Sequence, residues 1–346
     1  MADEFGSEKA PQGAHGGGEV GHVSVLLKEA IDFLAIRRGG TYIDATLGLG
    51  GHSFEIASRL GPQGHLIGFD KDTHALELAR QRLSGVGGDN HPKITLLHSS
   101  YAELPQHVPL ASADGLLADL GVSSLQFGNA ARGFSFQADG PLDMRMNPEG
   151  DRTADQVVNH MREEDLANVI YEFGEERRSR RIARAIVRAR PIRTTAHLAQ
   201  VISAALRSMN TGAHQKIHPA TLTFQAIRIF VNQELDDLKA LMQAAPQVLK
   251  KGGRLVVISF HSLEDRIVKD ALRDGAKAGI YDVLTRKPLT ATEEETDRNP
   301  RSRSAKMRVA ERLGAEGMGS KGIGSSGITY AGKKFNKFAG PGRGRP

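Results

Sequence analysis

The amino-acid sequence predicts an α/β fold in which a doubly wound parallel sheet is interrupted by a helical insertion. Between residues 41 and 118, short apolar segments alternate with amphipathic helical patterns, which is typical of a parallel sheet covered on both faces. The alternation lapses between about residues 140 and 219, where only helical patterns occur, and then resumes. With 346 residues, of which 39% are hydrophobic, the chain is long enough to bury such a core.

Each strand is predicted from a short apolar run, and each helix from apolar residues at helical spacing. The first half contributes an opening helix over 22–36, strands over 41–44, 65–69, 94–98 and 115–118, and helices over 52–60 and 73–83. The stretch without strands contributes helices over 161–173, 176–189 and 197–209. A long helix over 221–244, a Gly252-Gly253 turn and a buried strand over 254–260 complete the pattern. We therefore assign residues 22–139 and 220–312 to a sheet domain and residues 140–219 to an inserted helical domain.

The two ends of the chain differ in composition from its body. Residues 1–21 are polar and Gly-rich, and residues 313–346 carry six Lys or Arg against Glu316. Because large apolar side chains are scarce in both segments, we predict two disordered extensions, the second of them basic. The net charge of +6 favours a polyanionic partner.

The absence of cysteine excludes several classes of function. The chain has no disulfide framework, no thiolate nucleophile and no Cys-ligated metal cluster. It also has no apolar run of about 18 residues and no signal-peptide pattern. We therefore expect a cytoplasmic protein without a membrane partner.

A glycine-rich loop follows the first strand and predicts a nucleotide-like cofactor. Residues 48–51 lack most Cβ atoms, which lets a ligand approach the backbone, and Asp70 stands at the tip of the second strand, where it suits a ribose. Dinucleotides and S-adenosylmethionine both fit this pattern. Ser53 stands where the dinucleotide pattern has Gly or Ala, and Asp44 before the loop suits an ammonium group, so the methyl donor is favoured. An ordinary glycine turn is the third interpretation.

Asp119 follows the fourth strand and is expected at the carboxyl edge of the sheet, where ligands bind in such folds. The alternative is an ordinary helix N-cap. No Pro-Pro-aromatic sequence follows this acid, which argues against a DNA amino-methyltransferase of the usual kind.

Two further clusters carry charged side chains. Eight arginines fall between Arg177 and Arg193 without any acid, and we interpret them as a surface for phosphate groups, the alternative being a solvated helix face. His261, Glu264 and Asp265 lie where a strand meets a helix. Because no third ligand can be identified for a metal ion, capping and ion pairing are the preferred interpretation, and no metal is predicted.

Ten sequence blocks resemble a known family. They are HVSVLL (22–27), DATLGLGGHS (44–53), DLGVSS (119–124), GFSF (133–136), GPLDMRM (140–146), GEER (174–177), HPAT (218–221), FQAIR (224–228), SFHSLEDR (259–266) and RSRSAK (301–306). In this order they are similar to the bacterial ribosomal RNA small subunit methyltransferase H family. The resemblance implies a class I methyltransferase with a Rossmann-like sheet and an inserted helical domain. Its implied reaction is S-adenosylmethionine-dependent methylation of the N4 of one cytidine in the decoding region of 16S rRNA.

The resemblance also implies the cofactor-binding residues. These are the loop residues Gly50, Gly51 and His52, then Asp70 at the ribose, Tyr101 near the adenine, and Asp119 and Gln126 towards the methionine end. The implied partner is 16S rRNA or the small ribosomal subunit, and a homodimer stays open. A non-catalytic RNA-binding factor and a dinucleotide-dependent oxidoreductase are the two rival functions.

The implied reaction places demands on the residues near Asp119. The amino nitrogen of cytosine has a delocalised lone pair, so we expect an acceptor for an amino hydrogen, with Asp119 as the catalytic candidate and a neighbouring carbonyl group as the alternative. The target base has to leave its stack. Phe134 and Phe136 are near enough in sequence to offer a stacking surface, and core packing is the equal alternative.

Overall fold

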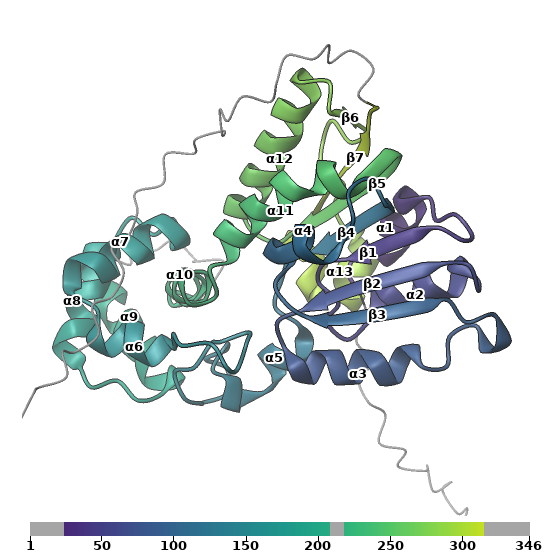
Figure 1. The fold of residues 1–346 in the computed structure, drawn as a ribbon. Helices are drawn as coiled ribbons and strands as arrows, with labels where there is room; N and C mark the ends of the chain where they lie inside the picture. The colour runs from purple at the N-terminus through teal and green to yellow at the C-terminus, as the bar shows by residue number, and fades with distance from the viewer. Residues whose placement is uncertain (1–23, 208–217, 315–346) are drawn as a thin grey trace, which may run out of the picture. The chain divides into compact units, whose positions relative to one another are not determined.

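The computed structural model describes residues 24–207 and 218–314. Within these residues, seven strands form one sheet in the order β3-β2-β1-β4-β5-β7-β6 (Figure 1). Strands β1 to β5 pair in parallel, whereas β7 pairs antiparallel with β5 and β6. The strands are β1 (Thr41–Asp44), β2 (His65–Asp70), β3 (Lys93–His98), β4 (Ala113–Asp119), β5 (Leu249–Ser259), β6 (Tyr281–Val283) and β7 (Lys306–Arg312). The strand order reverses between β1 and β4, which is where ligands bind in open α/β sheets.

The two faces of the sheet are covered by different helices. Side chains alternate along a strand, so in β5 Leu255 and Val257 join one core while Val256 and Ile258 join the other. The first core is closed by α4 (Leu104–His107), α11 (Glu234–Val248) and α12 (Ser262–Lys277). The second core is closed by α1 (Leu27–Leu34), α2 (Gly51–Leu60) and α3 (Thr73–Leu83). This arrangement confirms the predicted doubly wound α/β fold.

The residues between β4 and α11 build a separate hydrophobic core from helices. It is enclosed by α6 (Ala154–His160), α7 (Glu163–Gly174), α8 (Ser179–Ala189), α9 (Thr195–Arg207) and α10 (Thr221–Asn232). Two short helices, α5 (Ser124–Gly128) and α13 (Glu293–Arg298), lie outside this group. Phe224 and Ile227 of α10 belong to this core, although the sequence assigned residues from 220 onward to the sheet domain. The division into two domains therefore stays a prediction.

The long helix predicted over 221–244 is wrong, because the chain breaks between α10 and α11 at Gln233. This residue has a left-handed backbone conformation with φ of 55°. The preceding Asn232 stabilises the break, since its side chain donates to the Met144 carbonyl (2.8 Å) and accepts from the Met146 N–H (2.7 Å). These partners are remote in sequence, so helical periodicity alone does not reveal the break.

The predicted Gly252-Gly253 turn is also wrong. Both glycines lie inside β5, at a point where the register with β4 shifts, and Gly252 has a φ of +76°. Two steps along β4, from Ala113 to Gly115, stand opposite five steps along β5, from Leu249 to Arg254, so β5 carries three extra residues at this irregularity. Strand β5 is not the last one either, because β6 and β7 follow it.

The ends of several elements differ from the predictions. The opening helix begins at Leu27 and ends at Leu34, where Ala35 adopts a left-handed conformation. The disorder predicted for 1–21 and for most of 313–346 lies outside the described residues, as does the end of the helix predicted over 197–209. No helix in the described part of the chain is long and apolar enough to cross a membrane.

Candidate active site

The predicted site residues follow four neighbouring strands of the sheet. Tyr101 lies just beyond β3, Asp70 ends β2, Gly50 lies between β1 and α2, and Asp119 ends β4. Because these strands are adjacent in the order β3-β2-β1-β4 and run parallel, their carboxyl ends form one continuous edge. The structure therefore brings the predicted residues to the same edge of the sheet (Figure 1).

The glycine loop has a backbone that other residues adopt poorly. Gly48 and Gly50 have φ angles of +51° and +74°, in the left-handed region. The Gly48 N–H donates to Asp70 Oδ2 at 2.8 Å, which ties the loop to the end of β2. At Gly51 an added Cβ would lie 1.9 Å from Ser24 Oγ. Packing against Ser24 is therefore a reason for glycine at this position that the sequence pattern did not reveal.

Two acids surround this loop. Asp44 is 1% exposed, and it accepts hydrogen bonds from Thr46 N–H (3.1 Å) and Ser53 Oγ (2.7 Å). It therefore holds together the residues on either side of the glycine loop. Asp70 is half-buried, and Oδ1 accepts from the Asp72 N–H at 2.8 Å. Burial raises the pKa of Asp70 to about 6, although its two backbone hydrogen bonds oppose the shift. Its partial exposure leaves oxygen lone pairs that a ribose can reach.

Asp119 has the least satisfied polar group at this edge. Its Oδ1 is buried and has no hydrogen-bond partner among the described residues. Its Oδ2 lies 3.7 Å from Nδ1 of the buried His52, whose Nε2 is 3.1 Å from the Val25 carbonyl oxygen. Burial, followed by the charges of Asp44 and Glu264, raises the pKa of Asp119 to about 8. A half-buried acid with a buried, unused oxygen and a strongly shifted pKa is a candidate functional residue.

Gln126 takes part in a buried network instead of lining an open surface. Its side-chain amide donates to Asp72 Oδ2 at 3.0 Å, and its Oε1 accepts from the Ser123 N–H at 3.2 Å. Arg132 pairs with the same Asp72 oxygen at 2.7 Å. Although burial opposes the change, hydrogen bonds from Gln126 and Arg132 lower the pKa of Asp72. The network holds the chain that follows Asp119 against the start of α3.

Tyr101 lies at the β3 end of the same edge. It is half-buried and packs against the first core. Burial and the nearby charges of Asp237, Glu234 and Glu264 raise the pKa of its hydroxyl group. The ring is therefore a neutral aromatic surface at neutral pH, as the predicted adenine contact requires.

The cluster at His261 has a third member that sequence spacing did not reveal. Glu234 of α11 lies with His261 and Glu264, and one possible ligand atom from each lies within 4.8 Å of the others. The capping prediction is confirmed, because His261 Nδ1 accepts from the Glu264 N–H (3.4 Å) at the start of α12. Ion pairing is confirmed for Asp265, which binds Arg308 at 2.7 Å. Both oxygens of Glu234 already accept from Arg228 at 2.8 Å, so its charge is compensated, and the absence of a metal stays a prediction.

Two aromatic residues predicted near the target base belong to cores. Phe134 is 4% exposed, and the ring of Phe136 lies 4.9 Å from that of Phe224 in the helical core. The ring of Phe260 lies against Gly121, which follows Asp119 by two residues. A Cβ added at Gly121 would lie 3.0 Å from the Phe260 ring. Phe260 also lines a hollow of about 240 Å³ together with Arg303 and Lys306. Apart from its place at the end of a predicted strand, no sequence pattern points to Phe260.

Comparison with known proteins identifies the family. The profile of the MraW methylase family matches residues 19–313. A protein of Koribacter versatilis named ribosomal RNA small subunit methyltransferase H is 72% identical over 300 residues, which cover 86% of this chain and 96% of that protein. A protein of Acidobacterium capsulatum with the same name is 65% identical, over 82% of this chain and 96% of its own length. The chain therefore belongs to the MraW methylase family.

Proposed function

We propose that this chain transfers a methyl group from S-adenosylmethionine to the N4 of a cytidine in the decoding region of 16S rRNA. S-adenosylmethionine is the cofactor. The RNA substrate is proposed because both relatives are named as small subunit rRNA methyltransferases. The observation that carries the proposed chemistry is the buried Oδ1 of Asp119 at the switch point between β1 and β4, which has no hydrogen-bond partner within residues 24–207 and 218–314.

The cofactor fits the residues along the sheet edge. Tyr101 offers a neutral ring for the adenine, Asp70 has lone pairs for the ribose hydroxyl groups, and Gly50 has the left-handed backbone of the tight loop beside them. Asp119 offers an unused acceptor for the methionine portion. Gln126 supports this end indirectly through Asp72. The bound donor supplies a methyl group attached to a positively charged sulfur, which is a good leaving centre.

The methyl transfer needs alignment more than acid–base chemistry. The amino nitrogen of cytosine attacks the methyl carbon in line, the carbon–sulfur bond breaks, and one amino proton leaves. We assign Asp119 as the acceptor of that proton. Alignment of this kind is worth roughly 7 to 11 kcal/mol, and a positioned base contributes about 10²- to 10⁴-fold.

The hollow beside Phe260 is the proposed place for the unstacked cytosine. Its aromatic ring suits stacking, and Arg303 and Lys306 suit the phosphates that flank an extruded nucleotide. Contact between Phe260 and Gly121 joins this hollow to the loop that begins at Asp119. Helices α6 to α9, which lie within residues 140–219, belong to the proposed inserted domain, and residues 22–139 and 220–312 form the proposed methyltransferase domain.

The test is methyl transfer by an Asp119→Ala variant. Small subunits from cells that lack this protein are incubated with labelled donor, and the methylated nucleotide is mapped. We expect one N4-methylated cytidine with the wild type and none with Asp119→Ala, while circular dichroism shows a folded variant. Asp282→Ala, an exposed aspartate in β6, is the control and keeps full activity. If the wild type transfers no methyl group to rRNA, the chain is instead a non-catalytic RNA-binding factor, and full activity of Asp119→Ala removes this residue from the mechanism.

A further inference from the structure

We propose that one face of helix α8 binds phosphate groups of the RNA backbone, an inference that rests on the proposed function. This arginine face consists of Arg180, Arg181, Arg184 and Arg188. It goes beyond the methyl-transfer site because α8 lies in the helical core region and not at the carboxyl edge of the sheet.

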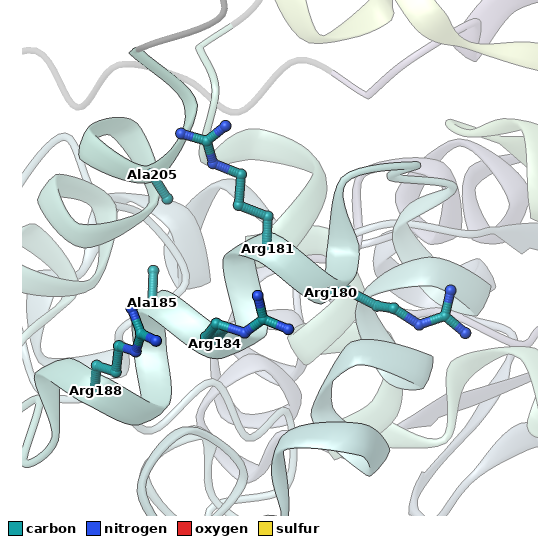
Figure 2. Close-up of a pocket in the computed structure, with 6 residues that line it drawn as sticks. All are labelled: Arg180, Arg181, Arg184, Ala185, Arg188 and Ala205. Atoms are coloured by element: carbon teal, nitrogen blue, oxygen red, sulfur yellow. The ribbon is translucent and has the colours of Figure 1, made fainter.

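Helix α8 is sharply divided between an apolar and a basic side. Ile182, Ala183 and Ile186 are fully buried in the helical core. All four residues of the arginine face are exposed. Figure 2 shows their guanidinium groups extending from α8, with the small Ala185 between them and Ala205 of α9 nearby. These six residues line a hollow of about 530 Å³, which is large enough to admit a phosphate group between the side chains.

The structure separates the arginines that stabilise the fold from those that do not. Arg178 is paired with Glu176 at 3.0 Å, and Arg190 donates to the carbonyl oxygens of Val158 and Met161. Arg178 and Arg190 therefore stabilise the fold, and they are removed from the set of eight arginines that the sequence predicted to bind phosphate. Within the arginine face, Arg184 lies 3.4 Å from Glu163.

Two arginines of this face carry a charge that no acid of the described residues compensates. Neither Arg180 nor Arg188 has an acidic partner in residues 24–207 and 218–314. Like charges on successive turns of one helix repel one another, so this face destabilises α8 unless an anion binds. The planar guanidinium group matches phosphate oxygens with two parallel hydrogen bonds, and RNA presents such oxygens in a regular series. RNA phosphates thus satisfy both the charge and the spacing of several arginines at once.

The test compares salt dependence of binding to small subunits. In the quadruple variant Arg180→Gln, Arg181→Gln, Arg184→Gln and Arg188→Gln, glutamine preserves helix propensity while it removes four charges. If each arginine neutralises one phosphate, the ratio of Kd at 200 mM salt to Kd at 50 mM falls by roughly 50- to 150-fold relative to the wild type. A matched variant with lysine at all four positions keeps the charge and is expected to retain the wild-type salt dependence.

A second quadruple variant controls for net charge alone. It replaces Arg59, Arg80, Arg273 and Arg298 by Gln, since all four are exposed and paired with nearby acids on helices outside the helical core. We expect its salt dependence to change by less than 3-fold. Equal salt dependence of the arginine-face variant and the wild type overturns the inference, as does an equal loss in both glutamine variants.

The same preparations separate this inference from the proposed function. Methylation of rRNA by the wild type, together with an unchanged salt dependence in the arginine-face variant, overturns the phosphate site alone. Absence of methylation by the wild type overturns the proposed function instead. Affinity for S-adenosylmethionine is expected to be the same in all variants, because the arginine face lies outside the sheet edge.

Discussion

Replacing Asp119 by Asn tests whether its carboxyl group is held protonated inside the folded protein. Burial and the charges of Asp44 and Glu264 raise the pKa of Asp119 from 3.8 to about 8. The folded protein therefore binds this proton more tightly than the unfolded chain does. The stabilisation present below pH 4 is lost progressively as the pH rises from about 4 to about 8. Asparagine resembles the protonated acid and cannot ionise, so the variant does not suffer this loss.

The size of the effect follows from the pKa. A difference of one bound proton between folded and unfolded states changes the free energy of unfolding by about 1.4 kcal/mol per pH unit. Between pH 5 and pH 7 the limit is therefore about 2.7 kcal/mol. Because 23% of the Asp119 side chain is exposed, water reduces the effect, and we expect about 1 to 3 kcal/mol. Asp70, with a pKa of about 6, titrates in both proteins and cancels in the comparison.

The assay is urea unfolding at pH 5, 6, 7 and 8 without cofactor. Far-UV circular dichroism follows the transition, because the chain contains no Trp. We expect the stability of Asp119→Asn relative to the wild type to increase by about 1 to 3 kcal/mol between pH 5 and pH 7. Parallel stability curves for the two proteins over this range would refute the proposed protonated state of Asp119.

Three further predictions concern the surroundings of the site. Arg132→Met leaves the buried Asp72 carboxylate without its guanidinium partner, and we expect the free energy of unfolding in urea to fall by about 3 to 5 kcal/mol. Adding Asp72→Asn should restore part of this stability, and a loss below about 1 kcal/mol in Arg132→Met would contradict the prediction. Gly50→Ala forces a side chain into a φ of +74°, at a cost of about 1 to 2 kcal/mol, and weakens S-adenosylmethionine binding in calorimetry. Gly85→Ala, which meets no atom within 4 Å, is its control and should bind normally. We expect binding of S-adenosylmethionine at pH 7 to release protons from Asp119, which calorimetry detects as a binding enthalpy that depends on the buffer. The Asp119→Asn variant should release fewer protons on binding.

The local part of the site is predictable because it depends on short sequence separations. Residues at the carboxyl ends of parallel strands meet at one edge, so Asp70 and Asp119 are located once the strands are recognised. The left-handed conformations at Gly48 and Gly50 follow from the tight turn into α2. Periodicity and turn chemistry are sufficient for these positions.

The remaining features depend on contacts between distant residues. Strand β7 carries four charged side chains among seven residues, and its burial depends on the pairing of Arg308 with Asp265, 43 positions earlier. Glu234 joins His261 only because α11 and the end of β5 meet in space. The use of Gln126 in the Asp72 network also depends on tertiary structure. No local pattern encodes these contacts.

The protonated state of Asp119 and its proposed role as proton acceptor are compatible if the cofactor controls the change between them. In the protein alone, the carboxyl group faces two acids and is predominantly neutral at pH 7, with a pKa of about 8. An opposite charge close to such a group typically lowers its pKa by about one to three units. A donor held beside Asp119 would supply a positive sulfonium, which would favour the ionised acceptor before transfer. Because the sulfur of the product would be neutral, the pKa of Asp119 would rise again, and the carboxyl group would retain the proton that the amine loses.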